Sequence, residues 1–529
     1  MKRLNLLIIY LAVSVYAYSQ TKANDYIHSG VAKFTAKDFK GAIHDFTKAI
    51  ELDTANAIAY SNRGLCKMEL RDLHGAEMDY TKALQFAPDN SGILDNRGLV
   101  ETEMNNYNRA MKDFDKAIEL TPNTAVLFKH RAIVKFYEKD FQGAIDDYSS
   151  AIKLHPEDAN TYKNRASAKD ELKDFEGAIK DYTSAIEHNP EFVEAYYNRG
   201  YSKDELKDYE GAMKDYTEAI KLKSDYGDAY YNRGLDKIKL DDIAGAIDDF
   251  SNAIKIKPDD VFSYRKRAIA KTKTDDAAGA IDDFNKVIEL TPDDYDAYKR
   301  RANLKTKLQD VAGALEDYNK AIQLKNDDSD AYKKRGLLKN KSNDFSGSIS
   351  DFDKAISLKP TDPEGYNYRG FAKHSEAHKL QPDENGFYKK TGAAQDMVRY
   401  FTEALEDYTK VIELAPSANG YNNRGSVKNE MKEFVGAVKD YDKAIELNPN
   451  NAQSFYSRGT AKKELNDLDG ALADFNQAIK IKPDYQEALF NRGLAKFNAG
   501  DKNGACEDWK KAADLGNDNA ANNLEEICK

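Results

Sequence analysis

Arginine and aspartate recur along this chain at a fixed interval, and together they form strong, often bidentate, charge-assisted hydrogen bonds. The interval is 34 residues, except that the arginines take one step of 55 residues before Arg424 and the aspartates take steps of 56 and 33 residues on either side of Asp407. The arginines are Arg63, Arg97, Arg131, Arg165, Arg199, Arg233, Arg267, Arg301, Arg335, Arg369, Arg424, Arg458 and Arg492. The aspartates are Asp45, Asp79, Asp113, Asp147, Asp181, Asp215, Asp249, Asp283, Asp317, Asp351, Asp407, Asp440, Asp474 and Asp508.

These two rows predict a ladder of ion pairs, because a charged side chain on the buried side of a helix needs a partner. Pairing within a repeat would leave Asp45 without an arginine, since Ser29 stands in the arginine's place. Pairing with the arginine of the next repeat would instead leave Asp508 alone. The sequence supports either register. We interpret the ladder as structural, with ligand binding by the arginines as the alternative.

A second charged pattern is a cluster of basic residues in three successive segments, 262–274, 296–308 and 330–342, which hold 15 basic residues against two acidic ones. We call this cluster the basic stripe. Its predicted partner-binding residues are Arg265, Lys266, Lys273, Lys299, Arg300, Asn303, Lys307, Lys333, Lys334 and Lys341. Such a surface favours an acidic peptide or another polyanion. The alternative is that these charges are balanced by second-helix acids such as Asp282, Asp283, Glu316 and Asp317.

An aromatic cluster gives another candidate site. Tyr197, Tyr201 and Tyr231 fall on consecutive units with Lys163 nearby, and could form a platform for an aromatic, prolyl or sugar ligand. The chain has 33 tyrosines, however, so these residues can equally be packing residues.

His374 and His378 lie one helical turn apart, the spacing of a two-histidine metal pair. The sequence shows no third ligand, and Glu376 is not placed as in a zinc-protease helix. We therefore assign no metal and no cofactor.

Motifs of catalysis are missing from the sequence: there is no glycine-rich phosphate loop, no nucleophile elbow and no cysteine–histidine site. The many paired carboxylates recur with the repeat, which is typical of solvated helix faces. We expect a protein that is not an enzyme. The alternative is a hydrolase or metal-dependent enzyme that uses an insertion at approximately 374–400.

Each 34-residue unit has the pattern of two short helices. In 227–260, apolar and small residues recur at three- or four-residue steps in both halves. Asp241 and Asp242 supply a turn and a cap between the halves. Pro258 closes the unit, because proline cannot continue a helix.

Fourteen such units cover residues 23–519, and the insertion lies in the eleventh, 363–417. The unit resembles the tetratricopeptide repeat, whose pattern has an aromatic residue and a small residue in the first helix, then alanine, aromatic, alanine in the second. Here these are Tyr230, Gly234, Ala246, Phe250 and Ala253.

The resemblance implies an all-α solenoid, a right-handed superhelix of about 14 helix-turn-helix repeats with a C-terminal capping helix that ends within 520–529. It also implies a non-catalytic scaffold that binds a peptide segment or protein partner in a concave groove lined by the first helices. The family usually has an apolar residue where this chain has arginine. Lys299 and Asn303 resemble half of a carboxylate clamp, but Glu364 and Tyr368 stand where its later basic residues would fall.

The three cysteines divide into two kinds. Cys66 is predicted to be a small buried residue. Cys506 lies on the last repeat's second helix and Cys528 at the end of the final helix, so an oxidising compartment would permit a disulfide that staples the terminal cap.

The first 19 residues have the pattern of a signal peptide: Lys2 and Arg3, an apolar run, and cleavage after Ala17 or Ser19. We therefore expect export to the periplasm or the medium, in a bacterial context, with no transmembrane segment in the mature chain. The net charge of −11 argues against nucleic acid as a partner. The expected partner is a protein or peptide, and the chain a monomer or a component of a complex.

Overall fold

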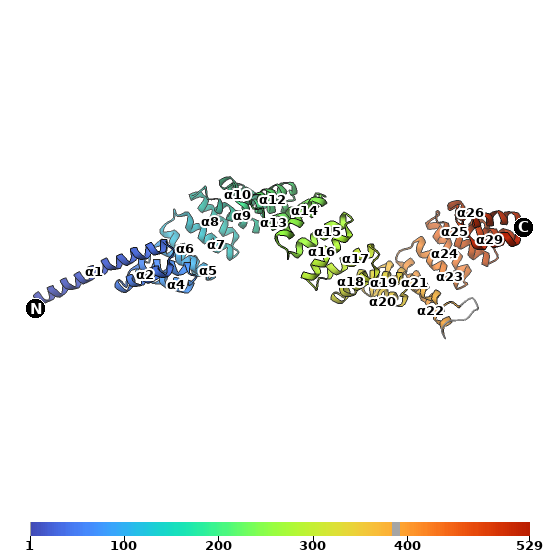
Figure 1. Ribbon diagram of the computed structural model, residues 1–529, viewed down its shortest axis with the longest axis horizontal. Helices are drawn as coiled ribbons and strands as arrows, with labels where there is room; N and C mark the ends of the chain where they lie inside the picture. The colour runs from blue at the N-terminus through green and yellow to red at the C-terminus, as the bar shows by residue number, and fades with distance from the viewer. Residues whose placement is uncertain (1, 383–391, 529) are drawn as a thin grey trace. The chain divides into compact units, whose positions relative to one another are not determined.

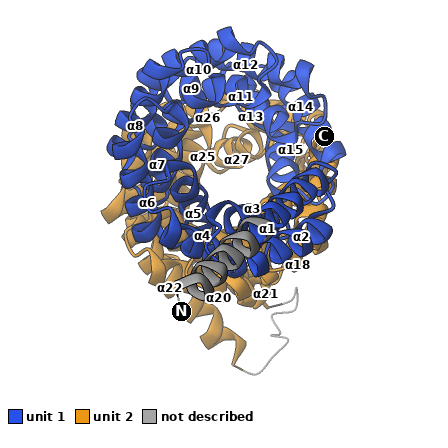
Figure 2. Cartoon of the chain, turned by 90° about the vertical axis from the view of Figure 1, so that its left-hand side faces the viewer, with its two compact units in different colours: residues 1–274 blue, residues 275–529 orange. Residues whose placement is uncertain are grey.

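The computed structural model describes residues 2–382 and 392–528, and every regular element in these ranges is an α-helix. The chain divides into two compact units, Met1–Thr274 and Asp275–Lys529 (Figure 2). Within each unit the helices follow one another as antiparallel pairs in chain order (Figure 1). The predicted all-α solenoid of helix pairs is confirmed.

Unit 1 contains fifteen described helices. They are α1 (Lys2–Thr35), α2 (Phe39–Leu52), α3 (Ala57–Glu69), α4 (Leu73–Phe86), α5 (Ser91–Glu103), α6 (Tyr107–Leu120), α7 (Ala125–Tyr137), α8 (Phe141–Leu154), α9 (Ala159–Glu171), α10 (Phe175–His188), α11 (Val193–Glu205), α12 (Tyr209–Leu222), α13 (Gly227–Lys239), α14 (Ile243–Ile256) and α15 (Val261–Lys273).

Unit 2 contains the remaining fourteen described helices. They are α16 (Ala277–Leu290), α17 (Tyr295–Lys307), α18 (Val311–Leu324), α19 (Ser329–Lys341), α20 (Phe345–Leu358), α21 (Pro363–Lys379), α22 (Ala393–Leu414), α23 (Ala418–Glu430), α24 (Phe434–Leu447), α25 (Ala452–Glu464), α26 (Leu468–Ile481), α27 (Gln486–Asn498), α28 (Lys502–Asp514) and α29 (Asp518–Ile527).

The turn between the two helices of a repeat is built by two acidic residues in 227–260. Asp241 has a φ of 64°, a left-handed conformation that short polar residues tolerate. Asp242 then caps α14, and its carboxylate accepts a hydrogen bond from the backbone N–H of Gly245. The chain can therefore reverse between α13 and α14 without leaving the first amides of α14 unsatisfied.

Close packing of the two helices depends on a glycine in the first helix and an aromatic ring in the second. Phe250 is fully buried, and a Cβ added at Gly234 would lie 2.9 Å from its Cε1 atom. Ala246 and Ala253 are buried on the same side of α14. The small residues therefore let the helix backbones approach, and the ring fills the space that remains.

The first helices of unit 1 lie on the inner side of its curve. In Figure 2, α7, α9, α11 and α13 face the inside of the blue arc, and α8, α10, α12 and α14 form its outer layer. Side chains that face away from the repeat pair on the first helices therefore line a concave surface of this unit.

The insertion lengthens one helix pair of unit 2. The first helix, α21, has 17 residues where α13 has 13, and the second helix, α22, has 22 residues where α14 has 14. The first helix continues through His378 to Lys379, and the second begins at Ala393. Part of the predicted insertion at approximately 374–400, residues 383–391, lies outside the described residues.

At the N-terminal end, α1 runs from Lys2 to Thr35, so the predicted signal segment and the first repeat share one helix. Among the described residues, no helix is both long and apolar enough to cross a membrane.

Candidate functional site

Within each unit, the arginine–aspartate ladder pairs an arginine with the aspartate of its own repeat. Arg233 on α13 donates from Nε to Asp249 Oδ2 at 2.9 Å and from Nη2 to Oδ1 at 2.6 Å, and Arg199 holds Asp215 with the same two distances. The Asp249 side chain is only 2% exposed. This register leaves Asp45 without an arginine, and that carboxylate instead accepts a 2.6 Å hydrogen bond from Ser29.

The same arginines connect neighbouring repeats. The third donor of Arg233, Nη1, reaches Thr217 Oγ1 on α12 of the preceding repeat at 3.0 Å, and Arg267 reaches Ser251 at 3.0 Å in the same way. The Arg233 guanidinium also lies 5.4 Å from the centre of the Tyr230 ring. The arginines therefore have a structural role. Asp283, the aspartate that follows Asp249 in the aspartate row, is also buried and lies near the start of unit 2.

A lysine completes the ladder, which the sequence pattern did not reveal. The Nζ atom of Lys237 is 2.8 Å from Asp249 Oδ2 and 3.2 Å from the Gly245 carbonyl oxygen. Where Glu101 replaces this lysine, Arg109 on the second helix supplies the positive charge, 3.3 Å from Glu101 Oε1. Asp249 thus has two cationic neighbours, Arg233 and Lys237.

The basic stripe in unit 2 is largely neutralised by acids of its own. Lys299 lies 2.6 Å from Asp328 and Lys333 lies 2.7 Å from Asp362, both at the start of the following first helix. These acids precede the first helices, whereas Arg301 pairs at 2.5 Å with Asp317, one of the second-helix acids that the sequence suggested. Burial opposes the charge of Lys333, but hydrogen bonds to Asp362 and Glu364 raise its pKa.

The other members of the basic stripe in unit 2 also contact polar groups within that unit. Arg300 pairs with Asp296 at 2.6 Å, and Lys334 donates to Asn303 at 2.8 Å. Lys307 lies 2.6 Å from Asp275, and Lys341 donates to Gln309. Arg265, Lys266 and Lys273 belong to α15 of unit 1. A polyanion would therefore have to compete with existing ion pairs for much of this surface.

The three tyrosines of the predicted platform have different surroundings. Tyr197 packs against the ring of Tyr226 at 4.9 Å and accepts a 2.9 Å hydrogen bond from Asn232. Tyr231 is half-buried, with its ring 5.8 Å from the core ring of Phe250. Only Tyr201, at 42% exposed, presents a large accessible ring. Two of the three rings therefore contribute to packing.

A better-formed aromatic site lies one step earlier on the same concave surface, where α7 and α9 meet. It is a pocket of about 330 Å³, which we call the groove pocket. Its lining residues are Ile133, Phe136, Tyr137, Tyr148, Lys163, Asn164 and Ser167. Tyr137 is 58% exposed, and its ring stacks on that of Tyr107 at 6.0 Å. In the sequence, the adjacent aromatic residues Phe136 and Tyr137, followed by Lys163 in the next first helix, could have indicated this pocket.

Lys163 differs from the lysines at the same place in other units. Lys129 lies 2.7 Å from Asp158, which is 29 residues further along the chain, the same separation as in the Lys299 pair with Asp328. The residue 29 positions after Lys163 is Phe192. Within the described part of the chain Lys163 has no ion pair, so the groove pocket combines an apolar wall with an uncompensated cation.

Models of the tetratricopeptide repeat match seven segments of the chain. The matched residues are 171–203 and 460–500 ("TPR repeat"), and 57–90, 92–124, 193–226, 418–451 and 440–473 ("Tetratricopeptide repeat"). These seven segments therefore match tetratricopeptide repeats. Proteins built from such repeats bind protein or peptide partners, and are typically non-catalytic.

Solved structures with tetratricopeptide repeats are distant in sequence. The Cut9–Hcn1 hetero-tetramer of APC/C is 14% identical, with 99% of this chain and 98% of that chain covered and a TM-score of 0.35. A tetratricopeptide repeat protein from Parabacteroides merdae is 19% identical, with coverage of 52% and 97% and a TM-score of 0.33. YrrB, described as having an unusual peptide-binding site, is 19% identical, with coverage of 40% and 98% and a TM-score of 0.31. A comparison with curated proteins gives no significant match.

Two carboxylates on first helices, the half-buried Asp170 and the buried Asp236, have strongly perturbed acidity. Burial raises the pKa of Asp170 to about 6, although hydrogen bonds from Tyr182 and Ser202, both 2.7 Å long, oppose the shift. Burial and the nearby charge of Asp204 raise the pKa of Asp236 to about 7. The Oδ2 atom of Asp236 has no hydrogen-bond partner among the described residues. These groups lie inside the helix packing.

A third polar group lies beside the two histidines of the repeat that contains the insertion. Glu430, at the end of α23 in the next repeat, lies 3.0 Å from His374 Nε2 through Oε1 and 3.1 Å from His378 Nε2 through Oε2. The sequence offered no third ligand because Glu430 is 56 residues from His374. Only the packing of adjacent repeats makes the three residues neighbours.

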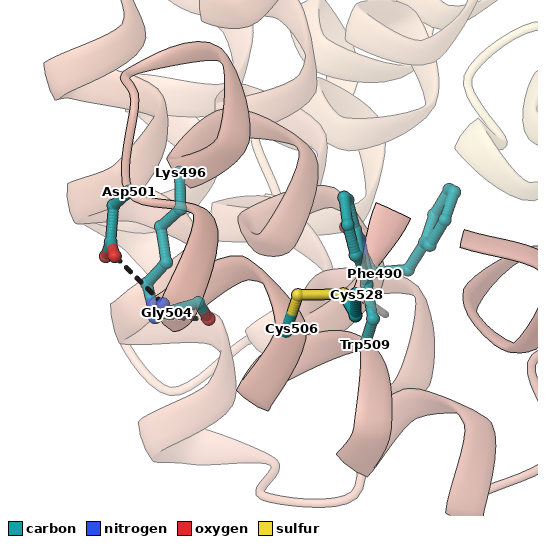
Figure 3. The surroundings of a disulfide bond; sticks show 7 residues. All are labelled: Phe490, Lys496, Asp501, Gly504, Cys506, Trp509 and Cys528. Carbon is teal, nitrogen blue, oxygen red and sulfur yellow. Dashed lines mark hydrogen bonds between the residues drawn. A yellow bond between two sulfur atoms is a disulfide. The ribbon is translucent and has the colours of Figure 1, made fainter. Parts of the chain in front are cut away.

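The last helix pair and the helix that follows it are joined by a disulfide. Cys506 on α28 and Cys528 at the end of α29 are bonded, with their Cα atoms 5.8 Å apart (Figure 3). Trp509 is fully buried beside this bond and donates from Nε1 to the Phe490 carbonyl oxygen at 3.2 Å. Cys66 is a buried free thiol whose pKa burial raises to about 11, so it is a packing residue rather than a reactive one.

Proposed function

We propose that this protein is a non-catalytic interaction scaffold that binds an extended segment of a partner protein along the first helices of unit 1, outside the cytoplasm. The observation that supports this function best is the groove pocket, where the exposed ring of Tyr137 lies in the same lining as an uncompensated Lys163. The engaged ladder and the neutralised part of the basic stripe make weaker candidates, because their charges already have partners.

The chemistry of the groove pocket specifies the kind of segment. A volume of about 330 Å³ is at the lower end of ligand sites, and is sufficient for one or two side chains rather than a large cofactor. Tyr137 and Phe136 favour an apolar or aromatic side chain, and Lys163 favours a carboxylate next to it. The proposed ligand is therefore a peptide with an aromatic or aliphatic residue adjacent to Asp or Glu.

A set of fluorescently labelled hexapeptides with Phe, Leu or Ser beside Glu or Gln tests this proposal. We expect the Phe–Glu peptides to bind best. Lys163→Ala should weaken them by roughly tenfold or more, because one charge-assisted hydrogen bond contributes about 1.5–3 kcal/mol. Tyr137→Ala should weaken the Phe peptides more than the Ser peptides.

Lys153→Ala is the matched control, because this exposed lysine lies on the second helix α8, away from the pocket lining. The Lys153→Ala variant should bind every peptide with the affinity of the wild-type chain. Equal binding by wild type and Lys163→Ala, or no dependence on the aromatic residue, would contradict the proposed site.

Export is the second part of the proposal. It is supported by the pattern of the first 19 residues and by the disulfide between Cys506 and Cys528, which is typical of an oxidising compartment. Mass spectrometry of the protein from its native host should give a mature N-terminus after Ala17 or Ser19. An intact N-terminus in the soluble cell fraction would contradict export.

A further inference from the structure

We propose that His374, His378 and Glu430 form a binding site for a divalent transition metal ion, with Zn²⁺ as the ion that fits this donor set best. Two imidazoles and one carboxylate are an established ligand set for Zn²⁺, which then keeps a fourth position for water. In the described part of the chain, these are the residues whose donor atoms gather as a group of three, all within 4.8 Å of one another.

The distances between the donors suit a metal ion. Metal–nitrogen and metal–oxygen bonds of about 2.0–2.2 Å at tetrahedral angles place neighbouring donors roughly 3.3 Å apart. The observed separations between His374 Nε2 and Glu430 Oε1, and between His378 Nε2 and Glu430 Oε2, are 3.0 and 3.1 Å. Small side-chain rotations would therefore open a cavity of the right size without a change in the backbone.

The surroundings hold both imidazole rings on the same side of α21. Phe401, a buried residue of α22, lies 5.7 Å from the ring of His374 and 6.0 Å from that of His378. The Gln381 amide lies 3.0 Å from His378 Nδ1. When Nε2 binds a metal, Nδ1 carries the proton, and the Gln381 side chain can accept it in a hydrogen bond after a rotation of its amide.

The exposure of the three residues leaves access for an ion from solvent. The side chains of His374, His378 and Glu430 are 16%, 45% and 26% exposed, respectively. The site is therefore backed by the helix packing on one side and open on the other, which is the arrangement of a three-ligand site that retains a water molecule.

The position of the site suggests its structural effect. His378 lies in the turn by which α21 exceeds the usual first helix, and Glu430 ends the first helix of the next repeat. A bound ion would thus join the lengthened helix pair to its neighbour. A ligand that binds only the folded state stabilises it, so metal should protect this junction from unfolding.

Isothermal titration of the full chain without a polyhistidine tag, using Zn²⁺ alone, tests the site. We expect one ion per chain in the wild type. His378→Gln, or Glu430→Gln, should weaken this binding by at least roughly a hundredfold, since even residues that only support a ligand change affinity by about 10–100-fold. Hydrogen exchange should show slower exchange at the C-terminal ends of α21 and α23 when Zn²⁺ is added.

His130→Gln is the matched control, because His130 also contacts a carboxylate, Asp95, at 2.7 Å, but has no second histidine beside it. It should bind Zn²⁺ as the wild type does, and circular dichroism should show all variants folded. Co²⁺ offers a separate readout, since a tetrahedral site gives visible absorption bands that His378→Gln should lose. No stoichiometric Zn²⁺ binding by the wild type, or equal binding by His378→Gln, would overturn the proposal.

Discussion

Truncation of one ladder arginine measures how much the ion pairs stabilise the repeat array. Arg233→Ala removes two hydrogen bonds to the buried Asp249, of 2.9 and 2.6 Å, and bonds to charged groups contribute about 1.5–3 kcal/mol each. It also removes the 3.0 Å bond to Thr217 in the preceding repeat. Lys237 remains 2.8 Å from the carboxylate, so Asp249 keeps one cation. We therefore expect a loss of about 3 kcal/mol, at the lower end of the about 3–5 kcal/mol found when a buried charge loses its partner.

The three members of this ion-pair group should differ in a fixed order. Asp249→Ala leaves both Arg233 and Lys237 without their carboxylate and should cost the most, about 3–5 kcal/mol. Lys237→Ala leaves the bidentate pair intact and should cost about 1 kcal/mol. The exposed Lys255 on α14 is the control, and its change to alanine should stay within about 0.5 kcal/mol of wild type.

Hydrogen exchange is the appropriate assay, because a linear repeat array does not unfold as one two-state unit. A local loss of about 3 kcal/mol corresponds to roughly hundredfold faster exchange of the protected amides in α13 and α14. Repeats far from this pair should change little. If the amides of α13 and α14 exchange within about twofold of wild type in both Arg233→Ala and Asp249→Ala, the structural role of the ladder is refuted.

Two further predictions follow from buried groups. Burial raises the folded-state pKa of Asp236 to about 7, so between about pH 4 and pH 7 the carboxyl ionises in the unfolded state but stays protonated in the folded state, and stability falls as pH rises. Asp236→Asn should therefore raise the melting temperature more at pH 8 than at pH 5, and an equal shift at both pH values would contradict the raised pKa. The Cys506–Cys528 disulfide closes a 22-residue loop, and its replacement by two serines should destabilise the terminal cap by about 3 kcal/mol. Faster hydrogen exchange of the α29 amides would measure this loss. Unchanged hydrogen exchange in α29 would show that packing around Trp509 alone holds the cap.

The repeat, its helices and its core residues could be predicted because each is a local property of the sequence. Gly234 and Phe250 recur with the period, and close approach of two helices needs a small residue opposite a large one. Asp242 was predictable as a cap because its side chain acts on the amides directly after it. The register of the ladder was not predictable, since Arg233 is 16 residues from Asp249 in its own repeat, and the preceding repeat also offers a partner.

The surroundings of the groove pocket and of the two histidines were harder to predict, because they depend on contacts between neighbouring repeats. Lys299 and Lys333 carry the same charge as Lys163 in the sequence, and nothing local separates them. Only the packing of one first helix on the next places Asp328 beside Lys299. For the same reason Glu430 could not be assigned to the histidines, since the insertion disturbs the 34-residue spacing between its repeat and the next.

Comparison of equivalent lysines shows how a nearly uniform array acquires a site. Lys129, Lys299 and Lys333 each neutralise an aspartate 29 residues further on, and in doing so fasten one first helix to the following one. At Lys163 the equivalent residue is Phe192, so the cation stays available while the ring of Phe192 packs with the apolar core around Tyr182. If this is the origin of specificity, Phe192→Asp should pair with Lys163 and abolish binding of acidic peptides without any change in the pocket lining. Peptide affinity that survives Phe192→Asp in a folded protein would show that Lys163 does not contact the ligand.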